Sequence, residues 1–172
     1  IMALPSDVTI YPPSNHHVTF QVDHGIIEIK NSVFYFIHNT YQTHGGAINI
    51  GTNSGHTVNK LIMTQLGFIN CKTLTNYYGG AIYSETKQIQ VSNICASKCR
   101  APSTSFQMAY FKINENGLEN NFSHVSIYQC GTNNNGRTSL CFAGRFNQLT
   151  VNYINSTSNF NYLGEFSYGC CF

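Results

Sequence analysis

Charged residues and helix-forming residues are both scarce in this sequence. Asp, Glu, Lys and Arg make up 9% of the 172 residues, against roughly 25% in an average soluble protein. The formal net charge is +2 and there is no run of Lys or Arg, so the chain lacks the basic surface with which proteins neutralise nucleic-acid phosphates. No apolar run approaches the roughly 18–20 residues of a membrane-spanning helix, and no signal peptide is visible. We therefore expect no nucleic-acid partner and no membrane span in this segment.

The residues that are plentiful favour β-strands. Ala, Leu, Glu and Lys are few, whereas Val, Ile, Thr, Tyr, Phe and Asn dominate. Short stretches such as Val18–Val22 and Leu149–Tyr153 alternate between apolar and polar residues, which is typical of strands with one buried face. The sequence predicts an all-β fold.

A four-residue motif occurs twice. Gly45–Ile48 and Gly79–Ile82 both have the sequence Gly-Gly-Ala-Ile, and they lie 34 residues apart. Glycine adopts backbone conformations that other residues avoid, and it lets another backbone approach closely. The motif therefore indicates a tight bend that enters a short strand, and its recurrence indicates a repeat.

A weaker repeat extends along most of the chain. Apolar residues tend to fall ten, eight, five and three places before an anchor, and the anchors are 24 to 32 residues apart. We place the anchors at Pro13, Asn39, Cys71, Cys99, Cys130 and Ile154. After each anchor come a polar loop and a further short run; these runs are His17–Val22, Gly45–Ile50, Gly79–Ser84, Phe106–Phe111, Ser139–Ala143 and Tyr162–Tyr168. Each unit is thus predicted to contain a strand, a bend, a second strand, a loop and a third strand.

Repeating units of three strands predict a parallel β-helix, in which equivalent strands of successive units stack. We expect about six coils in a single segment, residues 1–172, with a weaker N-terminal coil in 1–25 and clearer coils in 26–172. Cys71, Cys99 and Cys130 would form an inward-facing ladder at the inter-strand spacing of about 4.8 Å. An irregular β-sandwich is the alternative.

The ends of the chain suggest a piece of a larger protein. The sequence opens at Ile1, and it ends at Phe172, just after a predicted third strand, with no capping segment. Solenoids need covered ends, because an open end exposes strand edges and core. We expect a fragment without clear caps.

The motifs resemble those of a known family. Phe36–Asn39 fits the pattern Phe-x-x-Asn ahead of Gly45–Ile48, and Phe68–Cys71 precedes Gly79–Ile82 with Cys in place of Asn. Together they resemble the repeat of the chlamydial polymorphic membrane proteins and of related β-helix surface proteins of parasitic protists. The two copies span about residues 29–84. The resemblance implies a right-handed parallel β-helix with a surface-exposed or secreted, adhesin-like role, and it supplies no catalytic residues.

The acidic residues bear on the main alternative, a pectin-lyase-like enzyme acting on polysaccharide. Glycosidic hydrolysis needs two carboxylates about 5–10 Å apart. Only Asp23 and Glu28 fall near each other within one unit, and no two acids hold equivalent places in adjacent units. We expect no catalytic activity and no cofactor, and we keep the carbohydrate-active enzyme as the alternative.

Seven His and seven Cys could in principle bind metal. The pair Cys95 and Cys99 has no partner pair with zinc-ligand spacing, so we expect buried free thiols. In the next repeat, Asn70 takes the place of His38 and Tyr78 that of His44. Because a required metal ligand would not be replaced in this way, His38 and His44 are expected at surface or loop positions, and we expect no metal site.

The candidate binding residues lie in the loops that precede the glycine pairs. Tyr41, His44, Tyr77 and Tyr78 could form a ligand-facing surface, because an aromatic ring offers a broad apolar face and a polar edge. We expect a rigid shaft at the cell surface or outside the cell that presents these loops to glycans or host-surface proteins; a spacer without a ligand is a further possibility. Asn121 and Asn155 begin glycosylation sequons, which matter in a secretory pathway.

Overall fold

The computed structural model describes residues 7–10, 16–20, 25–40, 43–51, 58–74, 77–101, 107–131, 140–159 and 170–171. Within these residues there are eleven β-strands and no helix. Every pairing between the described strands is parallel. The β-sandwich alternative is therefore wrong, because successive strands of a sandwich pair antiparallel.

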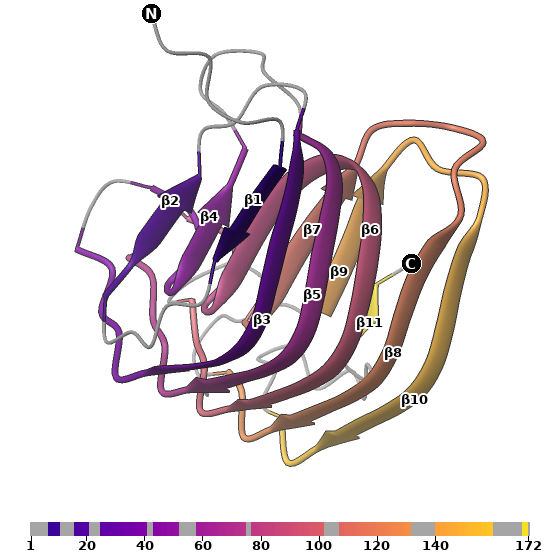
Figure 1. Cartoon of the computed structure of the whole chain (residues 1–172). Helices are drawn as coiled ribbons and strands as arrows, with labels where there is room; N and C mark the ends of the chain where they lie inside the picture. Colours follow the sequence, from indigo (N-terminus) through magenta and orange to yellow (C-terminus); the bar gives the residue numbers. More distant parts are fainter. Residues whose placement is uncertain are drawn as a thin grey trace, which may run out of the picture.

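Two ladders of strands run along the molecule (Figure 1). One ladder joins β1 (Asp7–Ile10), β3 (Ile26–Tyr35), β5 (Val58–Ile69), β6 (Ile82–Ser97), β8 (Asn120–Tyr128) and β10 (Leu149–Thr157). The other joins β2 (Val18–Phe20), β4 (Ile48–Ile50), the start of β6, β7 (Ala109–Ile113), β9 (Leu140–Gly144) and β11 (Cys170–Cys171). The chain thus winds into a β-solenoid of about four turns, which confirms the parallel β-helix; the expected count of six coils was too high.

Single residues with left-handed backbone bend each long strand. In β5, Gln65 has φ of 56° and is skipped by the pairing, since Thr64 pairs with Ser92 and Leu66 with Ile94. The same bend recurs in five long strands, and a second one follows five residues later, just past the strand end, with φ between 50° and 56°; the pairs are Asn31 and Phe36, Gln65 and Asn70, Asn93 and Lys98, His124 and Gln129, and Tyr153 and Ser158. Such angles are uncommon outside glycine. The first bend divides each of these strands into two segments, and the short strand supplies a third side of the solenoid.

The core consists of equivalent side chains stacked turn upon turn. The rings of Phe34 and Phe68 lie parallel with centroids 5.2 Å apart, and both are fully buried. Cys71, Cys99 and Cys130 are fully buried free thiols in successive turns, which confirms the inward ladder. Burial, and then the neighbouring thiol of Cys130, raise the pKa of Cys99.

The repeat register was wrong in the outer turns. Phe34 pairs with Phe68, so Ile37 rather than Asn39 takes the place of Cys71 in the preceding turn. Phe36, which the register placed inside, is 67% exposed, because the left-handed backbone at this residue turns its side chain outward.

Two further anchors were also misplaced. Ile154 pairs with Val125, so Asn159 occupies the place of Cys130, and its Oδ1 atom accepts a hydrogen bond from the Cys130 amide at 2.8 Å. Near the N-terminus, Val8 pairs with Ile27. It therefore takes the first apolar place of the repeat, which Ile27 holds in the next turn, whereas an anchor at Pro13 put it in the third place.

The expected third strands are largely confirmed. β2, β4, the start of β6, β7 and β9 all overlap the corresponding runs. The sixth run, Tyr162–Tyr168, lies outside the described residues.

The two glycines of each motif serve different purposes just ahead of the strand. Gly45 and Gly79 have φ of 69° and 73°, a conformation suited to glycine. A Cβ atom on Gly46 would lie 1.8 Å from the carbonyl oxygen of Gly80 in the next turn. The strands themselves begin only at Ile48 and Ile82, so the motif forms the bend into the strand, and only its last residue belongs to the strand.

Candidate functional site

Five aromatic side chains gather on the outer face of the short-strand ladder. We call this cluster the aromatic shelf; it consists of His44, Tyr77, Tyr78, Tyr83 and Tyr110. The first three come from the loops ahead of β4 and β6, and the last two come from β6 and β7. Tyr83 and Tyr110 are paired across the parallel strands, so the stacking of turns places their rings one above the other.

The rings of the shelf lie mostly face to face. His44 stacks on Tyr83 with ring centroids 4.2 Å apart and on Tyr78 with centroids 5.1 Å apart. Tyr78 stacks in turn on Tyr110 at 5.1 Å. Tyr77 meets His44 edge-on at 5.4 Å. Offset and edge-on contacts of this kind stabilise aromatic clusters beyond the area they bury, so the shelf is a preformed surface.

Polar groups fix the inner side of the shelf. The hydroxyl of Tyr83 donates a hydrogen bond to the carboxylate of Glu85, and Lys112 Nζ lies 3.1 Å from the other oxygen of that carboxylate. Burial is the main cause that raises the pKa of Tyr83, and the hydrogen bond to Glu85 adds to it. Burial likewise raises the pKa of Tyr110. Both phenols therefore stay neutral over the physiological range.

The outer side of the shelf is open to a ligand chiefly at Tyr78. Its side chain is 39% exposed, whereas Tyr83 is 7% exposed. His44, Tyr77 and Tyr110 are half-buried. The ring of Tyr78 is thus the most exposed of the five, and it packs against more buried rings.

Three of the four expected loop residues come together in the structure. His44, Tyr77 and Tyr78 belong to the shelf, while Tyr41 lies outside the described residues. Tyr83 and Tyr110 were not among the residues expected from the sequence. Each directly follows the residue that opens the short strand in its own turn, Ile82 or Ala109, and this shared position was the signal that could have found them.

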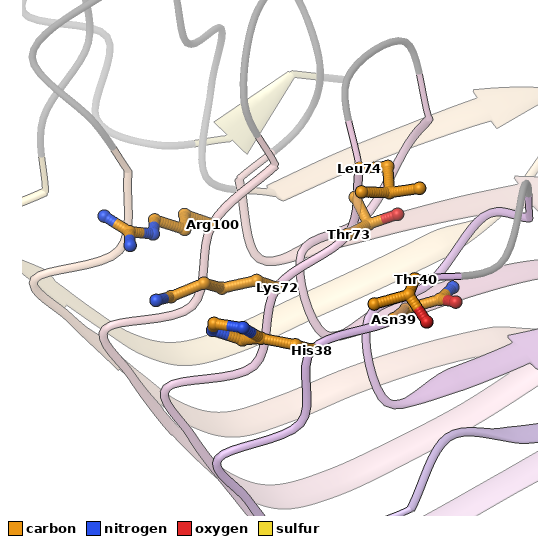
Figure 2. A pocket seen from close by; sticks show the side chains of 7 residues that line it. All are labelled: His38, Asn39, Thr40, Lys72, Thr73, Leu74 and Arg100. Carbon is orange, nitrogen blue, oxygen red and sulfur yellow. The ribbon is translucent and has the colours of Figure 1, made fainter.

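A second feature lies at the other end of the same loops. A cavity of about 300 Å³ is lined by His38, Asn39, Thr40, Lys72, Thr73, Leu74 and Arg100. Figure 2 shows the three basic side chains one above another in successive turns, extending in the same direction. Parallel bridges pair His38 with Lys72 and Lys72 with Arg100. The equivalent of His38 is therefore Lys72 and not Asn70 as the sequence analysis had it.

Asn39 holds the first of these loops closed. Its side-chain amide is buried and donates to the carbonyl oxygens of Gly45 at 2.9 Å and Thr43 at 3.2 Å. In the next turn Thr73 takes this place, and its hydroxyl donates to the Thr43 carbonyl at 3.3 Å. The Asn of the Phe-x-x-Asn pattern thus ties the loop to the glycine pair, and Cys71 is not its counterpart.

Most of the described glutamates form ion pairs with lysines. Glu28 lies 3.1 Å from Lys30, and Glu115 lies 3.7 Å from Lys87; Glu85 pairs with Lys112 as described above. Asp23, the other member of the pair weighed for catalysis, lies outside the described residues. Within the part of the chain that the structure describes, no three His, Cys, Asp or Glu side chains gather closely enough to hold a metal ion.

The two sequon asparagines are accessible. Asn121 lies in β8 and Asn155 in β10, and both side chains are exposed.

The described residues include no helix that could cross a membrane. Comparison of the chain with family models, with curated proteins and with solved structures found no match.

Proposed function

We propose that the protein is a non-catalytic, adhesin-like β-solenoid, exposed at a cell surface or secreted, that binds glycans through the aromatic shelf. The observation that carries the proposal is the stacked arrangement of His44, Tyr78 and Tyr110 with the Tyr78 ring exposed. His44 and Tyr110 stack on the Tyr78 ring, so a sugar contacts the exposed edge of this ring, and the phenol hydroxyl and nearby polar groups form hydrogen bonds with the sugar hydroxyls. A preformed platform also lowers the entropic cost of binding.

Two further features support a surface or secreted location. The paired Gly-Gly-Ala-Ile motifs resemble those of the polymorphic membrane proteins, and the glycine geometry gives the motif a physical role in the solenoid. Asn121 and Asn155 are exposed, as asparagines of used glycosylation sequons must be. A solenoid suits this role, because loops from successive turns repeat along a stiff shaft.

The test is binding of the purified chain to an array of neutral and acidic glycans and to host cells, with Tyr78→Ala beside the natural sequence. Removing the exposed ring should weaken binding about tenfold, since a buried aromatic contact at a binding hot spot contributes at least about 1.4 kcal/mol. Tyr153→Ala is the matched control. Tyr153 is 75% exposed and stacks on His124 with centroids 4.6 Å apart, but it lies in β10, away from the shelf.

The control variant should bind like the natural chain. Equal losses in both variants, or no binding to any glycan or cell by the natural chain, would overturn the proposal.

A further inference from the structure

Three basic side chains are stacked along the solenoid. We call His38, Lys72 and Arg100 the cationic ladder. They occupy equivalent places in three successive turns and are joined by parallel bridges, so neighbouring members are about 4.8 Å apart along the axis. Figure 2 shows the three side chains extending side by side in the same direction. His38 and Arg100 are exposed and Lys72 is half-buried.

The positive charges of the ladder, on Lys72 and Arg100, have no acidic partner among the described residues. Burial lowers the pKa of His38, and the charges of Lys72 and Arg100 lower it further. Burial, followed by the charge of Arg100, lowers the pKa of Lys72. Like charges directly opposite each other on paired backbones are destabilising, so the fold holds Lys72 and Arg100 together at a cost.

The backbone beneath the ladder is fixed. A Cβ atom on Gly46 would come within 2.8 Å of the Lys72 backbone, and one on Gly80 would come within 2.5 Å of the Arg100 backbone. The second glycine of each pair therefore packs directly against the backbone of a basic residue, Gly46 against Lys72 and Gly80 against Arg100. Together with the Asn39 side chain, these glycines hold the cationic positions in place before any ligand binds, and such preorganisation favours binding.

The cavity beside the ladder supplies polar groups and one apolar contact. Thr40 is exposed and contributes a hydroxyl, and Leu74 contributes an apolar surface that is 37% exposed. The buried Thr73 hydroxyl already donates to the Thr43 carbonyl. A hydroxyl donor and an apolar patch beside basic side chains match the mixed polar and apolar surface of a sugar ring that carries an acidic group.

We propose that the cationic ladder binds a linear saccharide bearing carboxylate or sulfate groups, laid along the solenoid axis. Charge-assisted contacts are about 2.7–2.9 Å long, so one oxyanion can bridge two neighbouring cations. The three side chains span about 10 Å. Lys72 and Arg100 carry the charge, while His38, whose pKa is lowered, offers a ring N–H as a neutral hydrogen-bond donor, so an extended saccharide is needed to engage all three. This inference rests on the proposed glycan-binding function and narrows its ligand class to acidic saccharides.

The ladder is too short for a nucleic acid. In the next turn Gly131 takes the place of Arg100, since its amide donates to the Cys99 carbonyl as the Arg100 amide does to that of Cys71. The net charge of the whole chain is +2. Single-stranded nucleic acid is held by a basic groove that follows the backbone over roughly 4–16 nucleotides.

The experiment is calorimetric titration of the folded chain with five probes at low and at physiological salt. The probes are a polyuronate hexasaccharide, a heparin hexasaccharide, a neutral glucan hexasaccharide, inorganic sulfate and a short oligothymidylate. The double variant combines Lys72→Gln and Arg100→Gln. The matched control is Lys98→Gln, which removes an exposed positive charge two residues before Arg100. Melting curves show that the variants are folded, and relief of repulsion should leave the double variant at least as stable as the natural chain.

The acidic hexasaccharides should bind the natural chain more tightly than the neutral one, and more weakly at higher salt. The double variant should lose about tenfold in affinity for them and keep its affinity for the neutral saccharide, while Lys98→Gln should change neither. The ladder proposal fails, and the proposed glycan-binding function stands, if the acidic hexasaccharides bind no more tightly than the neutral one. The same holds if Lys98→Gln loses as much affinity as the double variant. If sulfate binds as tightly as the acidic saccharides, or if oligothymidylate binds more tightly, the ligand of the ladder is not an acidic saccharide. No binding of any saccharide overturns the proposed function as well.

Discussion

The ring of His44 stacks on the ring of Tyr78, and its Nδ1 atom accepts a hydrogen bond from the Tyr78 backbone amide at 2.9 Å. The two residues are 34 positions apart and hold equivalent places in successive turns. An acceptor at Nδ1 requires the neutral imidazole with its proton on Nε2. The bond between the two loops therefore depends on the protonation state of one histidine.

We expect folding stability to fall as the pH drops below about 6.5, the ordinary pKa of histidine. Burial lowers the pKa of His44 in the folded state, against a smaller opposing effect of Glu85, and burial also lowers the pKa of His17. The unfolded chain therefore takes up protons first. The stability is fully present above pH 6.5 and is lost as the pH falls from there through the lowered pKa values. Chemical denaturation at a series of pH values measures this slope.

His44→Phe should reduce the slope, because phenylalanine keeps the stacking surface and cannot be protonated. His124→Phe makes the same change at an exposed ring that stacks on Tyr153, and the slope should stay as in the natural chain. An unchanged slope in His44→Phe would show that the contact with Tyr78 does not carry the pH dependence.

The sequence was sufficient to predict the fold class but not the register of every turn. Alternation of apolar residues and the regular spacing of Cys71, Cys99 and Cys130 predicted stacked parallel strands, and the middle turns agree with the structure. The first turn was misplaced because Phe34 and Phe36 are both apolar and both satisfy a period of two. The left-handed residues Asn31 and Phe36 decide between them; Asn favours such backbone angles, but nothing in the sequence marks Phe36 as left-handed.

Phe34 and Phe36 provide a direct test of that register. Phe34 is fully buried against Phe68, so Phe34→Ala should lower the free energy of unfolding by about 3–5 kcal/mol. Phe36 is 67% exposed, and Phe36→Ala should stay within about 0.5 kcal/mol of the natural chain. Urea denaturation of both variants gives the comparison, and the reverse order would restore the register with Asn39 as anchor.

The candidate sites were only partly predictable, for a related physical reason. His44, Tyr77 and Tyr78 could be found because aromatic residues ahead of a conspicuous glycine pair stand out in the sequence. The cationic ladder could not be found, because its members come from turns of unequal length and align only once the strands are paired. A shift of two residues in the first turn placed Asn70 beneath His38, where the structure has Lys72.

The glycine pairs should tolerate no side chain at their second position. A methyl group on Gly46 would overlap the Gly80 carbonyl oxygen of the next turn, so Gly46→Ala should cost about 3 kcal/mol or more. The matched control is Gly67→Ala. The nearest atoms to a Cβ at Gly67 belong to Val33 at 3.4 Å, and alanine in a strand is favoured over glycine by about 0.5 kcal/mol or more. Thermal unfolding of the two variants should therefore separate them clearly, and a mild effect at Gly46 would contradict the close approach of successive turns.

Ser84 is a polar residue at a core position, and its removal should stabilise the protein. It pairs with Ile50 on one side and Phe111 on the other; its side chain is fully buried, and its hydroxyl has no hydrogen-bond partner among the described residues. An unsatisfied buried hydroxyl costs about 1–3 kcal/mol, so Ser84→Ala should raise the free energy of unfolding by about 1 kcal/mol. Ser32→Ala is the matched control, because Ser32 is also buried but its hydroxyl donates to the Lys30 carbonyl at 3.0 Å. That variant should be neutral or less stable than the natural chain, and urea denaturation that shows the same sign of change for both serines would refute the assignment of an unsatisfied hydroxyl at Ser84.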